Sequence, residues 1–228
     1  MIIGISGQAG SGKDTIANFL LKYGFVKVAF ADPLKRIVKD IYAFTDEQLW
    51  GASKYRSIPD KRYPRESHVI QDGICLCCGG KESSQCYLTP RYSLQLLGTE
   101  YGRHCYENTW VDYGLRTAHI LLTNNCSYSQ QYGLSECCDN EVSRCKGVVI
   151  PDCRFQNEMT ATKNAGGFVV GIYRPGAGLQ GSAKGHASEA EMRAFSDDDF
   201  SYRIKNEGTL EALEIITDNM LEKLRYEL

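Results

Sequence analysis

The chain has 228 residues, of which 43% are hydrophobic and 24% are charged, a composition close to that of an average soluble globular protein. This length suffices for one α/β domain with a sizeable core, which excludes a mini-protein that depends on disulfides or bound metals for its stability. The 26 basic and 28 acidic side chains give a net charge of −2, which argues against a polyanionic partner such as nucleic acid and leaves any phosphate recognition to local features.

Strand and helix patterns alternate along the chain. The predicted strands are residues 2–6, 25–30, 147–150, 168–173 and 202–205. The predicted helices are residues 14–23, 32–41, 90–103, 109–122, 155–165, 188–195 and 209–225. This alternation predicts a three-layer α/β fold in which helices cover both faces of a five-stranded parallel sheet.

The domain organisation follows from the same patterns. We predict a single domain over residues 1–228, with residues 45–122 as a lid-like helical insertion that would bind the acceptor substrate, and residues 73–88 plus 123–146 as a small Cys-rich subdomain. The helices at 90–103 and 109–122 have similar lengths and a short connection, so we expect a helical hairpin that brings the segments before 90 and after 122 together.

The compartment decides how the cysteines are interpreted. The N-terminal segment has no basic stretch and no apolar run of signal-peptide length, and no window reaches the roughly 18 apolar residues of a membrane-spanning helix. We therefore expect a cytoplasmic protein without membrane contact. Thiols stay reduced there, so clustered cysteines indicate a metal site or catalysis more than disulfides.

A glycine-rich loop follows the first predicted strand. It matches the pattern GxxxxGK[ST] except at its last position, and its residues are Gly7, Gly10, Ser11, Gly12, Lys13, Asp14 and Thr15. Glycines let backbone N–H groups turn toward a phosphate, and the lysine reaches the β- and γ-phosphates of a nucleotide. Asp14 replaces the usual hydroxyl, so Mg²⁺ would be held by Asp14 or by Thr15.

A second polar element follows the strand at 147–150. Asp152 lies where a metal ligand or a water-orienting carboxylate belongs beside such a loop, although it could equally be the N-cap of the next helix. Arg154 would place a cation at the same rim, where it could stabilise charge on a transferring phosphoryl group.

With these residues in hand, the chain resembles the phage-type deoxynucleoside monophosphate kinases. The matching segments are residues 6–15, 31–35, 90–91 with 94–95, 97–100, 151–154 with 157–158, 173–176, 186–189 and 204–210. The Gly-Lys-Asp-Thr variant of the loop is itself part of the resemblance. The cysteine-bearing segments at 73–88 and 123–146 have no counterpart in it.

The resemblance implies transfer of the γ-phosphoryl group of ATP, with Mg²⁺, to a deoxynucleoside 5′-monophosphate. A bacteriophage source, a host-cytoplasm location and a homodimer would be in keeping with it. The residues that it implicates in catalysis are Lys13, Arg91, Asp152 and Arg154; in acceptor binding Lys35, Arg91, Gln95, Thr99 and Glu100; and in adenine contact Arg174. The base of the acceptor does not follow from any segment.

Several of these residues have plainer interpretations. Lys35 could be a solvated charge on a helix face, and Gln95 and Thr99 could be the polar side of an amphipathic helix. Arg91 opens its helix, where the macrodipole disfavours a cation, and this favours a functional role.

Eight of the ten cysteines lie in the two segments without a family counterpart. Cys75 and Cys78 form a C-x-x-C pair followed by two glycines, the form of a zinc knuckle. The predicted hairpin would bring a second pair to it, so we hypothesise a structural Zn²⁺ held by Cys75, Cys78, Cys138 and Cys145, with Cys77, Cys126 and Cys137 as alternates. Adventitious free thiols are the competing interpretation.

Other functions remain open at this point. A small-molecule kinase of the dephospho-CoA or phosphomevalonate type would use a related loop with another acceptor. A non-catalytic, nucleotide-dependent binding module with zinc-held loops is the alternative from a different class.

Overall fold

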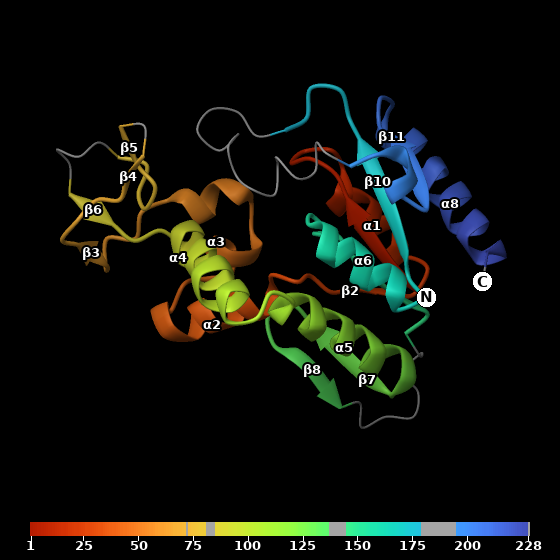
Figure 1. Ribbon diagram of the computed structural model, residues 1–228, viewed down its shortest axis with the longest axis horizontal. Coiled ribbons are helices and arrows are strands. Elements are labelled where there is room, and N and C mark those ends of the chain that lie inside the picture. Colours follow the sequence, from red (N-terminus) through yellow and green to blue (C-terminus); the bar gives the residue numbers. More distant parts are fainter. Residues whose placement is uncertain (72, 81–84, 137–144, 179–194, 228) are drawn as a thin grey trace. The chain divides into compact units, whose positions relative to one another are not determined.

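The computed structural model describes residues 1–71, 73–80, 85–136, 145–178 and 195–227 (Figure 1). The predicted helix at 188–195, most of which falls outside these ranges, residues 186–189 of the family resemblance, Cys137 and Cys138 are therefore not described. The chain forms two compact units, one comprising Met1–Phe30 with Val111–Leu228 and the other comprising Ala31–Trp110. We call them unit 1 and unit 2.

Unit 1 is built on a parallel five-stranded sheet in the order β11-β10-β1-β9-β2. The strands are β1 (Ile2–Ser6), β2 (Phe25–Lys27), β9 (Gly147–Ile150), β10 (Phe168–Tyr173) and β11 (Tyr202–Lys205). The predicted sheet is thereby confirmed, although β2 ends at Lys27 and not at residue 30. β1 is central and every one of its residues is buried, as a strand covered on both faces must be.

Helices cover both faces of this sheet. The helices of unit 1 are α1 (Lys13–Leu21), α5 (Thr109–Thr123, which begins in unit 2), α6 (Gln156–Asn164) and α8 (Leu210–Tyr226), with a short 3₁₀ turn η4 (Asp197–Asp199). Ile3 and Ile5 of β1 join a core with α1 and α8, whereas a Cβ on Gly4 would lie 3.4 Å from Thr162 of α6. Because neighbouring residues of a strand face opposite sides, these contacts place α6 on the face opposite α1 and α8.

Unit 1 also contains an antiparallel hairpin in the segment after α5. β7 (Cys126–Ser129) pairs with β8 (Gly133–Glu136). Within the described ranges, no helix is long and apolar enough to cross a lipid bilayer.

Unit 2 combines helices with four very short strands. Its elements are α2 (Asp32–Tyr42), α3 (Asp46–Trp50), η1 (Ser53–Ser57), β3 (Pro64–Arg65), β4 (Ile70–Gln71), β5 (Ile74–Cys75), β6 (Cys86–Tyr87), α4 (Pro90–Leu96) and η2 (Leu97–Arg103). Its core contains side chains of α2, α3 and α4 together with buried cysteines. The predicted insertion at 45–122 overlaps this unit over residues 45–110, and its role in binding an acceptor stays a prediction.

The predicted helix at 90–103 is not one regular α-helix. It changes at Leu97 into the π-helical segment η2, where the indole N–H of Trp110 donates to the carbonyl of Gly98 at 2.9 Å. The indole also lies against Gly102, where an added Cβ would come within 2.3 Å of the ring. A π-helical turn bonds residue i to i+5, so the face that Arg91 and Gln95 share on α4 does not continue regularly beyond Leu97.

Candidate active site

The glycine-rich loop connects the central strand β1 to helix α1. Gly10 and Gly12 have φ values of +77° and +109°, in the left-handed region that favours glycine. A Cβ on Gly7 would lie 2.3 Å from the carbonyl oxygen of Ile172, so only glycine fits there. The strand–loop–helix context required of a phosphate-binding loop is therefore present.

Lys13 and Ser11 are the polar side chains held within this loop. The Lys13 side chain is mostly buried, and its Nζ donates to the carbonyl oxygens of Gly7 at 2.5 Å and Gln8 at 2.6 Å. Ser11 is fully buried, and its Oγ has no hydrogen-bond partner among the described residues. The loop thus gathers an ammonium group and a hydroxyl at the carboxyl end of the sheet, where parallel α/β proteins bind their ligands.

Asn206 braces the loop from the end of β11. Its buried amide donates through Nδ2 to the carbonyl oxygen of Ser11 at 2.8 Å, and its own N–H donates to Tyr173 at 2.8 Å. A Cβ on Gly12 would lie only 2.7 Å from this Nδ2. Sequence reasoning gave Asn206 no role of its own. The available signal was a polar residue directly after a predicted strand, at the edge where the loop also lies.

The two predicted magnesium ligands lie in the first turn of α1. The Asp14 carboxylate is exposed and forms an ion pair with Lys27 of β2, with 2.6 Å between Oδ1 and Nζ. Thr15 is half-buried.

Asp152 follows β9, the strand next to β1. Its Oδ1 accepts a hydrogen bond from the backbone N–H of Phe30 at 3.0 Å, which ties the ends of two segments together. The N-cap of α6 is Phe155, so the alternative interpretation of Asp152 as the N-cap of this helix is wrong. Asp152 is thereby left at the rim of the sheet beside the phosphate loop.

Glu158 fixes the backbone that carries Arg154. Its buried carboxylate accepts from the N–H groups of Arg154 at 2.6 Å and Phe155 at 3.1 Å, so it satisfies free donors at the start of α6. The Arg154 side chain itself is exposed, as is Arg174 just after β10. Sequence reasoning missed the anchoring role of Glu158, for which its place in the first turn of the predicted helix was the available signal.

Cys153 lies between Asp152 and Arg154 in the sequence but is fully buried, and its Sγ lies 3.9 Å from Oγ1 of Thr162. Burial is the main reason that the pKa of this thiol is raised well above its usual value, and the nearby negative charge of Glu158 raises it further. A thiol that stays protonated is a poor nucleophile.

The predicted acceptor residues belong to unit 2. Nζ of Lys35 lies 5.7 Å from the centroid of the Trp50 ring, a cation–π distance. Arg91, at the start of α4, donates from Nε to Oγ of Ser57 and from Nη2 to Oγ of Ser53, both at 2.8 Å. Both cations are thus held by neighbouring side chains.

The other three acceptor candidates are exposed. Gln95 lies on α4, and Thr99 and Glu100 lie on η2. Glu100 is 3.5 Å from Nδ1 of His104, one turn further on. Exposure leaves their polar atoms accessible to a ligand and also fits the plainer interpretation of a solvated helix face.

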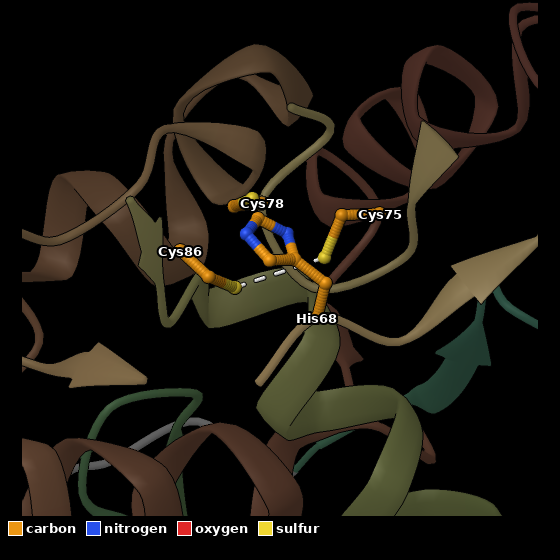
Figure 2. Close-up of side chains that lie close together, drawn as sticks. All are labelled: His68, Cys75, Cys78 and Cys86. Atoms are coloured by element: carbon orange, nitrogen blue, oxygen red, sulfur yellow. Dashed lines mark hydrogen bonds between the residues drawn. The ribbon is translucent and has the colours of Figure 1, made fainter. Parts of the chain in front are cut away.

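A group of metal-binding side chains lies elsewhere in unit 2. The ligand atoms of His68, Cys75, Cys78 and Cys86 all lie within 4.8 Å of one another, and Figure 2 shows the four side chains converging on a common point. Two of these residues were predicted, whereas His68 and Cys86 were missed. The missed signal was that both lie in the same short stretch of sequence as the C-x-x-C pair.

Two of the predicted zinc ligands, Cys138 and Cys145, are not among the four described residues of this group. Cys138 lies outside the described residues, and the thiol of Cys145 donates to the carbonyl oxygen of Gly147 at 3.0 Å in unit 1. Of the alternates, Cys77 donates to the carbonyl oxygen of Tyr87 at 3.3 Å and accepts from the thiol of Cys86 at 3.6 Å, and Cys126 belongs to β7. The described group is therefore completed from the C-x-x-C segment itself, and Cys145 is replaced in it.

A glycine loop with a buried lysine, between the central strand of a parallel sheet and the next helix, is the mark of a P-loop protein that binds nucleotide phosphates. No protein-family model matches the chain. A protein of Acanthamoeba polyphaga mimivirus named "Putative deoxynucleotide monophosphate kinase" is 31% identical over 200 residues, which cover 87% of this chain and 86% of that protein. The chain belongs to this family of nucleotide kinases.

Two solved structures were also found to be similar. Shikimate kinase from Aquifex aeolicus has a TM-score of 0.43 and 10% sequence identity, covering 99% of this chain and 96% of its own. The protein TT1252 from Thermus thermophilus has a TM-score of 0.41 and 19% identity, covering 98% and 97%.

Proposed function

We propose that this protein transfers the γ-phosphoryl group of ATP to a deoxynucleoside 5′-monophosphate and releases the corresponding diphosphate. The proposal rests above all on the buried Lys13 within a glycine loop that leads from β1 into α1. The family to which the chain belongs supports a nucleotide kinase, and the name of the mimivirus relative supports the acceptor class.

The residues of the loop fit the phosphates of ATP. The buried Ser11 hydroxyl has no partner among the described side chains and backbone groups, and leaving such a group unsatisfied costs about 1–3 kcal/mol. A phosphate oxygen would supply the partner. Lys13 would exchange its two carbonyl contacts for the β- and γ-phosphates, and the left-handed glycines would keep side chains out of the cradle.

Mg²⁺ bound with ATP would supply positive charge that offsets the negative charge of the phosphates during transfer. Asp14 or Thr15 would hold it from α1, and Asp152 would hold or orient its water ligands from the neighbouring strand. The variants Asp14→Asn and Thr15→Val distinguish these two candidate ligands. Replacing the residue that binds Mg²⁺ should raise the Mg²⁺ concentration needed for the half-maximal rate.

The acceptor phosphate would be bound by guanidinium and ammonium groups. We assign it to Arg91 and Lys35 of unit 2, with Gln95, Thr99 and Glu100 for the sugar or base. Arg154 would stabilise charge in the transition state, and Arg174 would contact adenine. Arginine suits phosphate because its planar fork donates two parallel hydrogen bonds.

The test is ADP release measured with a panel of deoxynucleoside monophosphates, together with dephospho-CoA and phosphomevalonate as rival acceptors. Turnover that depends on at least one deoxynucleoside monophosphate is the expected result. Turnover only with a rival acceptor would reject the proposed substrate class, and no acceptor-dependent turnover at all would favour a nucleotide-dependent binding module.

A further inference from the structure

We propose that unit 2 contains a structural zinc site in which Zn²⁺ is bound by Nδ1 or Nε2 of His68 and by the sulfurs of Cys75, Cys78 and Cys86. The proposal does not rest on the proposed kinase activity, since all four ligands lie outside the residues assigned to the nucleotide and the acceptor.

The distances between the ligand atoms suit one tetrahedral ion. Two sulfurs bound to the same zinc at about 2.3 Å are about 3.8 Å apart in tetrahedral geometry. The Sγ atoms of Cys75 and Cys86 are 3.7 Å apart. All four ligand atoms lie within 4.8 Å of one another, so only a small contraction brings them onto one ion.

The β4–β5 hairpin brings His68 to Cys75. Ile70 pairs with Cys75, and a further bond from the N–H of Leu76 to the carbonyl of Val69 at 2.8 Å extends the ladder. His68 is two residues before Ile70 and therefore lies on the same face of the ladder as Cys75. Cys86 comes from another ladder, in which β6 pairs with β3 and Cys86 lies opposite Arg65.

The turn that carries Cys78 has the form of a zinc knuckle. The N–H of Gly79 donates to the carbonyl of Cys75 at 2.7 Å, and the N–H of Gly80 donates to the sulfur of Cys78 at 3.4 Å. Gly79 adopts a φ of +73°, which a side chain would disfavour. Backbone donors to sulfur stabilise a thiolate, the form in which cysteine binds a metal.

The segment that carries these four residues needs a stabilising cross-link such as a bound metal ion. Its four strands are two residues long, and Val69, Ile70, Ile74 and Leu76 are all exposed by more than a third. A stretch with so little core of its own requires a metal or cross-links to hold one conformation. A disulfide between Cys75 and Cys86 would leave the convergence of His68 and Cys78 on them without a function.

Zinc suits this donor set better than the other common ions. Three sulfurs and an imidazole nitrogen are a donor set that favours Zn²⁺, whereas Mg²⁺ and Ca²⁺ take oxygen ligands. On binding, the thiols of Cys75, Cys78 and Cys86 release their protons to solvent and the imidazole binds in its neutral form, so no oxidant or reductant is required.

The site is connected to the helix that carries Arg91. Oγ1 of Thr89 donates to the carbonyl of Cys77 at 2.6 Å and accepts from the N–H of Tyr92, which makes Thr89 the N-cap of α4. Cys75, Cys77 and Cys86 also pack into the core formed with α2, α3 and α4. A bound zinc would therefore fix the start of α4 as well as the short strands.

The test is the metal content of the full chain, purified under reducing conditions and measured by inductively coupled plasma mass spectrometry. The wild type should contain about one zinc per chain and no stoichiometric iron. Cys86→Ser and His68→Ala should each weaken zinc binding by more than the about 10–100-fold that loss of a supporting residue costs. The matched controls Cys77→Ser and Cys105→Ser should keep their zinc.

A measurement on the unchanged protein guards against variants that fail to fold. Replacing zinc with Co²⁺ should give the intense visible absorption of a tetrahedral cobalt–thiolate centre. Folded wild type without zinc that also gives no such spectrum, zinc retained in Cys86→Ser, or zinc lost in Cys77→Ser but kept in His68→Ala would each overturn the proposal. A stoichiometric iron content would likewise contradict it.

Discussion

The phosphate loop of unit 1 and the His68–Cys86 cluster of unit 2 are built in opposite ways. The loop is shaped by its own backbone and braced by Asn206, between a fully buried strand and a helix. The cluster consists of side chains that converge from two-residue strands with little apolar cover. We infer that the first site keeps its shape without a ligand, whereas the second depends on its metal for structure.

Lys13→Ala gives the largest expected effect and acts on chemistry alone. It removes the ammonium group that would bind the transferring phosphate, so kcat should fall by about 10³-fold or more. Steady-state kinetics measures the loss, and the melting temperature should barely change. The control is Lys22→Ala just beyond the other end of α1, where the ammonium group pairs with Glu214 on the surface. An equal loss of activity in both variants would contradict the assignment.

Zinc removal, unlike Lys13→Ala, should act on the structure of the protein. A strong chelator should speed amide hydrogen exchange over residues 64–88 and at the start of α4, while β1 and α1 keep their protection. Melting temperature should fall by about 2–4 °C for each kcal/mol of zinc-linked stability, and added Zn²⁺ should restore it. Exchange that is unchanged in unit 2, or that increases equally in unit 1, would refute the proposed contrast between the two sites.

Arg91→Ala tests whether unit 2 binds the acceptor. Loss of a charged hydrogen bond costs about 1.5–3 kcal/mol, so KM for the acceptor should rise by about 10–100-fold while KM for ATP stays constant. Ser57→Ala removes one contact of Arg91 and keeps its charge, and Arg62→Ala removes a guanidinium that pairs with Asp60. Both controls should have much smaller effects. A rise confined to KM for ATP would show that Arg91 contacts ATP and not the acceptor.

Asn206→Ala probes the brace of the phosphate loop. The loss of its bond to Ser11 should lower the free energy of unfolding by about 1 kcal/mol, measured by urea denaturation, with a modest rise in KM for ATP. Asn206→Asp keeps the size of the side chain but replaces the donor with an acceptor, so it should be worse than alanine. An aspartate variant as stable as wild type would show that the hydrogen bond is unimportant.

Cys153→Ala should have the smallest effect on catalysis. The thiol is fully buried with a raised pKa and stays protonated, and phosphoryl transfer between bound substrates needs no covalent enzyme intermediate. The ratio kcat/KM should therefore stay close to the wild-type value. A loss comparable to that of Lys13→Ala would reveal a chemical role for this cysteine.

The fold was largely predictable because the relevant signals are local. Five apolar strands separated by amphipathic helices define the parallel sheet, and the loop of residues 7–15 carries its conformational requirements in its glycines. The change to π-helix at Leu97 was not predictable, because it accompanies the packing of Trp110 against Gly102. A helical periodicity contains no information about an indole that arrives from a later residue.

The side-chain cluster was only half predictable for a related reason. The C-x-x-C pair is contiguous, but the positions of His68 and Cys86 depend on the register of two ladders of two-residue strands. A change of register by one residue would turn each side chain to the other face. The sequence placed Glu158 and Asn206 in matching segments but did not predict their structural roles, because these depend on which backbone atoms the two side chains reach.

The most direct test of the central claim follows the phosphoryl group itself. ATP labelled at the γ-phosphate is incubated with Mg²⁺, wild-type protein and each deoxynucleoside monophosphate, and the products are separated by chromatography. We predict that the label appears in a deoxynucleoside diphosphate, and that Lys13→Ala abolishes this transfer. Label found only in inorganic phosphate, or remaining in ATP with every acceptor, would contradict the account.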